Sequence, residues 1–593
     1  MKIKTIKDIY FFQLNTCPRV DSFCFKKDQE WIKTPIDQLV NKATKLASFL
    51  ISVGLKKGDK IGVISTSRTE WFIVDLAISQ LGLISVPVFA NLKHKQYEYI
   101  YNTTAIKCLF ISDLERYKKI EPALSNIKSL EYTYSFDPIP GLLSIDEIIL
   151  KNDFMDLEEV QQISTHIKPS DIATIIFTSG TTGDPKGVVL THKNIVTNVL
   201  DATSLFSIKT KGTESALSLL PIYHNFEKMV CYSYILKGVA IYFNDSIENI
   251  LSNIQEIKPS TFIAPPKLLE KIYERITILG KELKGIKKIL FNWSLKLAKK
   301  YNEKGENSWF YNLKLALARR IIFVKWKEKL GGQIQFIGTG SSACQLVILK
   351  VFHAVGIPIL EGYGITECSP VVSINKLDDY HLGTVGHVLP TIKLKLTKEN
   401  EILLKGPTVT LGYYNQPELT KKTFTKNGWY ITGDIGELIE GNYLKIVDRK
   451  AEIFSLSFGN KVSPQIIENV VKTSPYIENV FAVGDGQDHV SAIIQPNWQA
   501  LNNLNETDYL SVEYRQEYIK NQDVQNLIKQ EIISLNKSLK NHEKVKNFRL
   551  ITDTWKIETD ELTPTLKLKR KNLYNKYQYL IKEMFANEKY NSI

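Results

Sequence analysis

Alternation of apolar runs with amphipathic stretches is the feature that most restricts the fold of the first part of this chain. Residues 60–65, 84–89 and 107–112 are short apolar runs typical of buried strands, and residues 70–80 have helical periodicity. Strands separated by helices are joined by right-handed crossovers and form a parallel sheet. We therefore expect a doubly wound α/β fold.

The pattern changes further along the chain, which predicts several structural units. Residues 171–380 repeat the alternation of strands and helices, 381–446 hold short strands punctuated by glycine, and 452–593 mix helices with a few strands. A chain of 593 residues has room for about four units of domain size. We expect an N-terminal domain over residues 1–448, with two α/β subdomains and a small β subdomain near 381–446, and an α+β C-terminal domain over residues 449–593.

One loop has the composition of an anion-binding site. The segment Thr178-Ser-Gly-Thr-Thr-Gly-Asp-Pro-Lys-Gly187 directly follows an apolar run that we interpret as a buried strand. Its glycines allow a tight turn whose N–H groups face an anion, and Lys186 adds a positive charge. The spacing is not that of the P-loop, because Gly180 and Gly183 are only three residues apart and Lys186 precedes glycine. A hydroxyl-rich turn without a ligand is the alternative that we disfavour.

Composition argues against several other classes of protein. The chain has no uncharged apolar run of about 18 residues, and its first residues lack the apolar core of a signal peptide. The six cysteines form no CxxC pair, and the nine histidines include no HExxH. Free thiols suit a reducing compartment, so we expect a cytoplasmic protein.

The net charge of +13 is concentrated in one block. Residues 281–330 contain 14 Lys or Arg and four Glu, without the motifs of a nucleic-acid-binding module, so we expect no nucleic acid as partner. An apolar row at helical spacing runs through the block: Ile286, Ile289, Leu290, Trp293, Leu297 and Tyr301. Such a helix can lie on the inner face of an anionic membrane as a peripheral anchor. The alternative, which we favour, is that the row packs inside the protein and the lysines are solvated.

Four further segments follow the loop in a fixed order. They are Glu361-Gly-Tyr-Gly-Ile-Thr-Glu367, Tyr430-Ile-Thr-Gly-Asp434, Val447-Asp-Arg-Lys450 and Thr563-Pro-Thr-Leu-Lys-Leu-Lys-Arg570. Together with the loop they resemble the AMP-forming acyl-CoA synthetases of the adenylate-forming superfamily. Within that family the chain looks most like the long-chain fatty acid–CoA ligases.

The resemblance implies a site for ATP and magnesium. The phosphate loop would comprise Thr178, Ser179, Gly180, Thr181, Thr182, Gly183 and Lys186. Contacts to AMP would come from Gly340, Ser341, Ser342, Ala343, Glu361, Gly362, Tyr363 and Gly364, and those to ribose from Asp434 and Arg449. Thr366 would contact phosphate, and Glu367 would hold Mg²⁺. The serines are a departure, because the family commonly has Gly-Gly-Ala there.

The resemblance also implies catalytic residues on both sides of a hinge. His224 would lie beside the acyl carboxyl group, and a lysine of a mobile C-terminal domain would lie over the α-phosphate. We place that lysine at Lys567, with Lys569 as an open alternative because residues two apart in an extended segment share a side. The hinge would be Lys450 and Ala451, where alanine is a second departure. Gly459 and Asn460 would face the acyl-adenylate when CoA reacts.

We therefore expect a long-chain fatty acid–CoA ligase that uses ATP, Mg²⁺ and CoA. A ligase that loads acyl carrier protein, or one that releases acyl-AMP, is the alternative within the superfamily. A non-catalytic protein that binds acyl-nucleotides or acts as a membrane scaffold is an alternative from another functional class. Retention of Lys186, Glu367, Asp434, Arg449 and Lys567 argues against it. The sequence does not decide between a monomer and a homodimer.

Overall fold

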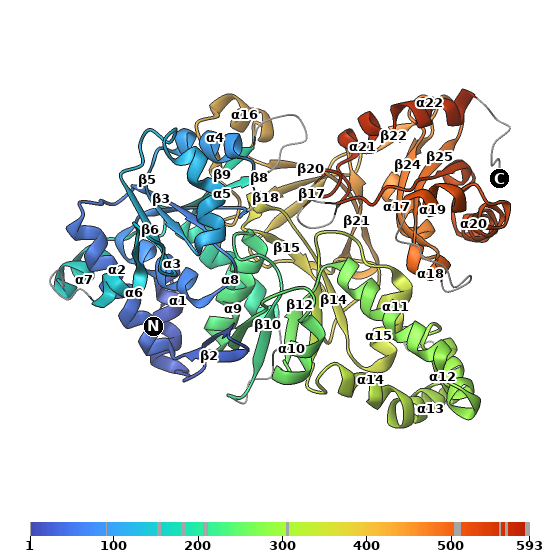
Figure 1. The fold of residues 1–593 in the computed structure, drawn as a ribbon, viewed down its shortest axis with the longest axis horizontal. Helices are drawn as coiled ribbons and strands as arrows, with labels where there is room; N and C mark the ends of the chain where they lie inside the picture. The colour runs from blue at the N-terminus through green and yellow to red at the C-terminus, as the bar shows by residue number, and fades with distance from the viewer. Residues whose placement is uncertain are drawn as a thin grey trace.

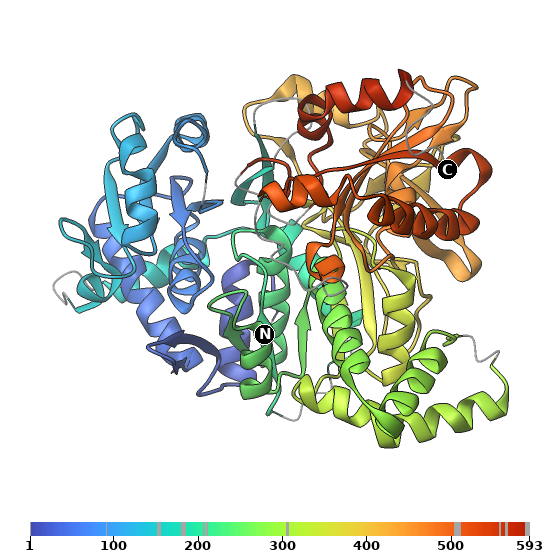
Figure 2. The same ribbon diagram turned by 45° about the vertical axis from the view of Figure 1, so that its right-hand side comes forward.

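A computed structural model gives the fold of most of the chain (Figure 1). The residues that it describes are 2–90, 92–150, 156–178, 185–205, 208, 212–303, 307–502, 512–556, 559–563 and 567–586. Figures 1 and 2 show a large body formed by the first three quarters of the chain and a smaller unit, coloured orange to red, on one side of it.

The first sheet confirms the alternation expected from the sequence. Its strands, in spatial order, are β19 (Gly412–Tyr413), β9 (Lys186–Thr191), β8 (Ile172–Thr178), β4 (Ile84–Val88), β3 (Lys60–Ile64), β5 (Ile106–Ile111), β6 (Tyr132–Ser135) and β7 (Leu143–Ser144). Pairing is parallel from β8 to β7, whereas β9 and β19 add antiparallel edge strands. The helices of this part are α2 (Ile36–Ser52), α3 (Thr69–Leu81), α4 (His94–Thr104), α5 (Leu114–Leu124), α6 (Ile145–Leu150) and α7 (Leu157–Thr165).

A second sheet lies beside the first. Its order is β16 (His387–Val388), β15 (Val371–Ile374), β14 (Ile359–Gly364), β13 (Phe336–Thr339), β12 (Thr261–Ile263), β10 (Ser215–Ser218), β11 (Ala240–Phe243), β1 (Phe23–Lys27) and β2 (Glu30–Thr34). Strands β14 to β1 are parallel. Its helices are α1 (Ile6–Thr16), α8 (His192–Leu205), α9 (Asn225–Lys237), α10 (Ile250–Ile257), α11 (Pro266–Glu282), α12 (Gly285–Ala298), α13 (Trp309–Ala318), π-helix η2 (Arg319–Phe323), α14 (Val324–Lys329) and α15 (Leu346–Val355).

Smaller sheets complete the chain. An antiparallel sheet contains β17 (Lys393–Leu396), β18 (Glu401–Lys405), β20 (Tyr430–Ile439) and β21 (Tyr443–Arg449), with α16 (Pro417–Thr423) nearby. The C-terminal unit has the hairpin β22 (Phe454–Ser455) and β23 (Lys461–Val462), and the sheet β24 (Ile477–Val483), β25 (Val490–Pro496) and β26 (Val545–Leu550). Its helices are α17 (Pro464–Val471), α18 (Trp498–Asn502), α19 (Val512–Tyr518), α20 (Gln522–Leu535), α21 (Arg570–Lys576) and α22 (Gln578–Ala586). The expected α/β fold class is thus confirmed.

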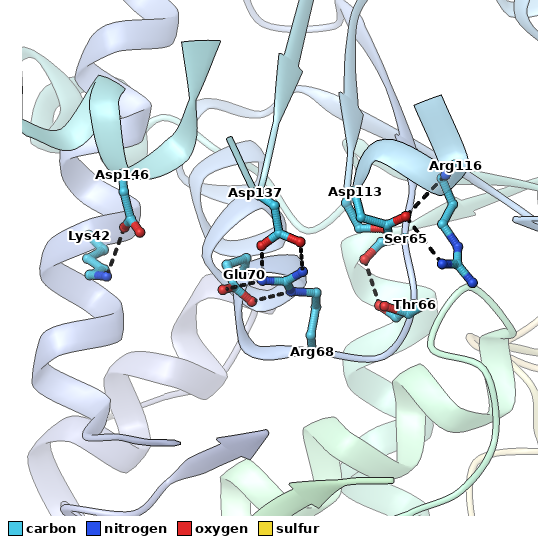
Figure 3. A network of polar contacts seen from close by, with 10 residues as sticks. Lys42, Ser65, Thr66, Arg68, Glu70, Asp113, Arg116, Asp137 and Asp146 are labelled. Atoms are coloured by element: carbon cyan, nitrogen blue, oxygen red, sulfur yellow. Dashed lines mark hydrogen bonds and ion pairs between the residues drawn. The ribbon is translucent and has the colours of Figure 1, made fainter. Parts of the chain in front are cut away.

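The early segment at Arg68 serves the fold (Figure 3). Its guanidinium makes paired hydrogen bonds with the carboxylates of Glu70, at 2.7 and 2.8 Å, and of Asp137, at 2.9 and 2.8 Å. It also lies over the rings of Phe25 and Phe136. Bidentate pairs of this kind fix geometry as well as adding energy, so Arg68 holds the start of α3 against the end of β6.

The apolar row predicted for residues 286–301 does not form one face. Ile286 and Ile289 are exposed, whereas Leu297 is buried among the residues of the second sheet's core. The row is divided because only the C-terminal half of α12 packs on the rest of the molecule. Across the described ranges, no helix is both long and apolar enough to cross a membrane.

Candidate active site

A cavity of about 420 Å³ opens where the parallel strands of the second sheet end. Its lining includes the residues after β10, β12, β13 and β14, together with Thr178 and Lys186 from the first sheet. The carboxyl ends of parallel strands are where open α/β sheets collect ligands. Lining residues from the antiparallel sheet and from the C-terminal unit complete the wall, so all parts of the chain meet here.

Asp434 lies behind the cavity wall, where it contacts two residues that line the cavity, Tyr363 and Arg449. Its carboxylate is 3% exposed, accepts a short hydrogen bond from the Tyr363 hydroxyl, and lies 2.8 Å from Nε of Arg449. Strands β20 and β21 place Asp434 opposite Arg449, because the two residues are register partners. Burial raises the pKa of the Asp434 carboxyl, while Arg449 and the Tyr363 hydroxyl oppose that shift. Each oxygen keeps acceptor capacity for a further hydroxyl group.

Glu367 lines the cavity from the short helix Thr366–Cys368. Its Oε1 accepts a hydrogen bond of 2.8 Å from the Tyr413 hydroxyl, which is itself 3.2 Å from the hydroxyl of Tyr430. Lys186 Nζ lies 5.9 Å from the centre of the Tyr413 ring. Tyr413 thus holds the carboxylate, Tyr430 contacts the Tyr413 hydroxyl, and Lys186 lies over the Tyr413 ring. The sequence motifs did not point to Tyr413, because its edge strand β19 is far from Glu367 in the sequence.

The donor set at Glu367 fits Mg²⁺. Magnesium in nucleotide sites is usually held by one or two carboxylates together with substrate phosphates and water. Among the described residues there is no group of three or more His, Cys, Asp or Glu side chains that could hold a metal alone. A single carboxylate facing a phosphate-sized space is therefore the arrangement expected for a metal that arrives with its nucleotide.

His224 caps the helix α9 at the cavity wall. Its Nδ1 accepts a hydrogen bond of 3.3 Å from the backbone N–H of Phe226, so the ring proton of the neutral form is on Nε2. Burial, and the nearby charge of Lys567, lower the pKa of His224 to about 4. At neutral pH the residue is therefore an uncharged hydrogen-bond donor at the cavity.

The structure separates the two candidate lysines. Lys567 lines the cavity, whereas Lys569 pairs with Asp560 outside it. Lys567 keeps much of its surface exposed, yet burial of the ammonium group lowers its pKa; Arg449 lowers it further, and Asp434 opposes both. The helix that follows is fixed by Arg570, whose Nη2 lies 2.5 Å from the buried carboxylate of Glu468.

Some expected site residues are not described, and others do not line the cavity. Ser179, Gly180, Thr181, Thr182 and Gly183 lie outside the described residues. The residues that are described but do not line the cavity are Ser342, Ala343, Glu361, Asp434, Lys450, Ala451, Gly459 and Asn460.

The position of Glu361 follows from strand alternation. Leu360 and Gly362 face the cavity, and Glu361, between them, points to the other side of β14. There its Oε1 accepts a hydrogen bond of 3.1 Å from the backbone N–H of Cys344, and burial raises its pKa to about 7. Tyr363 also lines the cavity, and the register of the strand is irregular directly after it, between Tyr363 and Gly364.

Family comparisons agree with this geometry. Residues 17–414 match the family model described as AMP-binding enzyme, and residues 452–589 match that of an AMP-binding enzyme C-terminal domain. The chain belongs to the AMP-binding enzyme family. The resemblance seen in the sequence is thereby confirmed.

Individual relatives of this AMP-binding enzyme cover nearly all of it. Fatty acyl-CoA synthetase A of Dictyostelium discoideum is 29% identical over 95% of this chain and 87% of its own length. Long chain acyl-CoA synthetase 3 of Arabidopsis thaliana is 30% identical over 93% of this chain and 86% of its own. The solved structure of the anthranilate CoA ligase AuaEII with anthranoyl-AMP superimposes with a TM-score of 0.73 at 18% identity, covering 98% and 99% of the two chains. The last comparison supports the fold.

Gly364 should be the most space-sensitive position in the cavity wall of this AMP-binding enzyme. A Cβ atom there would lie 2.2 Å from the carbonyl oxygen of Pro370, so Gly364→Ala must move β14 away from β15. We expect the rate of AMP formation to fall by about tenfold or more, since small displacements of positioning groups are costly. Gly62→Ala is the control, because it crowds only side-chain ends and is not part of the cavity. An unchanged rate in Gly364→Ala would contradict this account of the wall.

Proposed function

We propose that this protein is a long-chain fatty acid–CoA ligase that forms acyl-AMP and pyrophosphate and then acyl-CoA and AMP. The observation that carries the proposal is that Lys567, Arg449 and His224 line one cavity, and that Asp434 pairs with Arg449 beside it. A cation from the C-terminal unit would stabilise the negative charge that develops when the acid reacts with the nucleotide. The names of the relatives support the fatty acyl substrate and CoA.

In the first step, a carboxylate oxygen of the fatty acid attacks the α-phosphorus of ATP, and the bond to pyrophosphate breaks. Charge develops around that phosphorus, where Lys186 and Lys567 would supply positive potential without reorganisation. Asp434 and Arg449 would bind the ribose, and Tyr363 would lie against adenine. The Nε2–H of His224 would donate a hydrogen bond to the acyl carboxylate. Bound through Glu367, Mg²⁺ would neutralise phosphate charge.

In the second step, the thiol of CoA loses its proton and its sulfur attacks the acyl carbon, with AMP as the leaving group. We propose that Lys567 must leave the cavity first, and that the chain bends at Lys450 and Ala451. Lys450 now pairs with Glu399 and Glu401 at 3.0 and 2.9 Å. The turn with Gly459 and Asn460 is exposed, so it is free to approach the acyl-adenylate after this movement. The boundary between domains at residues 448 and 449 belongs to the same proposal.

The decisive experiment compares products with and without CoA. Purified protein given palmitate, ATP and Mg²⁺ should release AMP and form palmitoyl-CoA only when CoA is present. Acyl-AMP release without a requirement for CoA would favour an acyl-AMP ligase, and transfer to acyl carrier protein but not to CoA would favour the carrier-protein ligase. Absence of ATP turnover with acids of every chain length would favour the non-catalytic alternative.

We also propose that the region around α12 and α13 contacts anionic membrane, where long-chain acids partition. Ile286, Ile289, Trp309 and Leu313 are 75%, 68%, 66% and 61% exposed. Large apolar side chains rarely remain exposed together without a partner. Exposed basic residues accompany them on the same helices, namely Lys287, Lys288, Lys296 and Lys314, and Arg320 follows in the adjoining π-helix η2. Their charge would repel a second copy of this surface and attract acidic lipid.

Binding to vesicles tests this proposal. We expect sedimentation with phosphatidylserine-containing vesicles at low salt, and loss of binding at high salt or in Lys287→Glu/Lys288→Glu. Ile289→Ser/Leu313→Ser should weaken it too, because the apolar side chains insert among the lipids. Ile247→Ser, at an equally exposed residue elsewhere, is the matched control. Protein that stays in the supernatant with every vesicle would show that the surface is only solvated.

A further inference from the structure

Helix α11 has two faces with different partners. Leu269 and Ile272 are buried in the core of the second sheet. Lys267, Glu270 and Glu274 lie three and four residues apart, so they share another face of the same helix. Figures 1 and 2 both show the beginning of α11 directly against the C-terminal unit.

The polar face of α11 is bonded to the C-terminal unit. Lys267 Nζ lies 2.7 Å from Oε1 of Glu478 at the start of β24 and donates to the Glu478 carbonyl oxygen at 3.2 Å. Glu274 Oε1 accepts from the side-chain amide of Asn497 at 2.7 Å. Burial would raise the pKa of Glu478, but the charge of Lys267 outweighs it and the pKa is lowered. The carboxylate is therefore charged when it meets Lys267.

Glu270 contributes through a neighbouring side chain. Its Oε1 accepts a hydrogen bond of 3.2 Å from the amide of Gln345, and the same amide donates to the carbonyl oxygen of Lys472 at 3.4 Å. Lys267, Glu270, Glu274 and Gln345 all lie outside the cavity lining. They do not touch the space where we place the substrates.

A second attachment lies next to the hinge. The carboxylate of Asp448 is 1% exposed and accepts hydrogen bonds from the Ser463 hydroxyl at 2.5 Å and the Gln465 backbone N–H at 3.2 Å. Asp448 ends the antiparallel sheet, whereas Ser463 and Gln465 begin α17. The C-terminal unit is thus fixed at two points, and it carries Lys567, which lines the cavity.

We propose that the polar face of α11 is a docking site that positions Lys567 for adenylation and must release the C-terminal unit before CoA can react. Lys267, Glu274 and Glu478 are accordingly positioning residues. This inference rests on the proposed function. Since the docked arrangement serves only the first step, weakening it should slow acyl-AMP formation and leave the second step intact.

Charge reversal separates docking from general damage. Lys267→Glu and Glu478→Lys each place like charges together, and each should slow single-turnover acyl-AMP formation by about tenfold. Conversion of supplied acyl-AMP and CoA to acyl-CoA should be unchanged. The combined variant restores opposite charges and should return adenylation to within about threefold of the unmodified protein. Arg275→Glu, at an exposed residue of the same helix, is the matched control.

Two results would overturn the proposal. One is an equal loss in both half-reactions, which indicates damage to the fold. The other is a combined variant no faster than the slower single variant, which indicates that the two charges do not act on each other.

A cross-link between α11 and the C-terminal unit detects the docked arrangement without a measurement of activity. Glu274→Cys/Asn497→Cys, joined by a short thiol-reactive linker, should be captured as an intramolecular product by mass spectrometry. The linked protein should form acyl-AMP but not acyl-CoA. Absence of the linked product would overturn the docking site, whereas a linked protein that turns over no fatty acid would count against the proposed function alone.

Discussion

Replacement of Lys567 by alanine is expected to slow acyl-AMP formation by about 10²- to 10³-fold, the scale on which enzymes lose rate when one charge-stabilising group is removed. Lys567 is the cation that the C-terminal unit brings to the cavity, near Asp434 and Arg449. Formation of acyl-CoA from supplied acyl-AMP should be nearly unaffected, because the C-terminal unit has then moved. Rapid-quench measurement of each half-reaction distinguishes the two effects.

Lys569→Ala is the matched control for this prediction. Lys569 has the same charge and lies only two residues away, but it pairs with Asp560 outside the cavity. Loss of the Lys569 side chain should change the rate of either half-reaction by less than about twofold. A larger defect in Lys569→Ala than in Lys567→Ala would mean that the catalytic lysine is wrongly assigned.

Asp434→Ala should lower kcat/KM for ATP by about 10²-fold. The carboxylate is buried, is held by Arg449 and Tyr363, and keeps acceptor capacity for two ribose hydroxyls. Hydrogen bonds to a charged group contribute about 1.5–3 kcal/mol each, so two of them at the lower end of this range account for a loss of this size. The effect should lie mainly in KM, because ribose is bound equally in the ground and transition states.

Two comparisons keep this prediction specific. Asp434→Asn keeps an acceptor but loses the charge, so its defect should be smaller than that of alanine. The KM for the fatty acid should change little in either variant. An unchanged KM for ATP in a variant that unfolds at the normal temperature would show that the ribose binds elsewhere.

Local sequence pattern determined the central strands of the first sheet. The runs at residues 60–65, 84–89 and 107–112 are recovered as β3, β4 and β5 within one residue at each end. They are predictable because a buried strand in a parallel sheet is apolar on both faces, a property of a few consecutive residues. Family motifs likewise identified Lys186, Glu367 and Asp434 before any geometry was known.

Side-chain direction was less accessible from the sequence. Glu361 belongs to the same motif as Tyr363, yet it faces away from the cavity and binds the backbone of Cys344. The alternation of a strand predicts that outcome for Glu361. The irregular register after Tyr363 depends on pairing with β15 and has no local signal.

Contacts between distant segments were decided only by the tertiary structure. The spacing of Lys567 and Lys569 allowed either as the catalytic cation, and the choice depends on Asp560, which pairs with Lys569. The row of residues 286–301 looked continuous, but only its second half meets the core of the second sheet. Periodicity shows which residues share a face; it does not show what that face packs against, because the partner lies far away in sequence. For this reason the sequence by itself determined the chemistry of the site, whereas the attachment of the C-terminal unit to α11 and Asp448 emerged only from the folded chain.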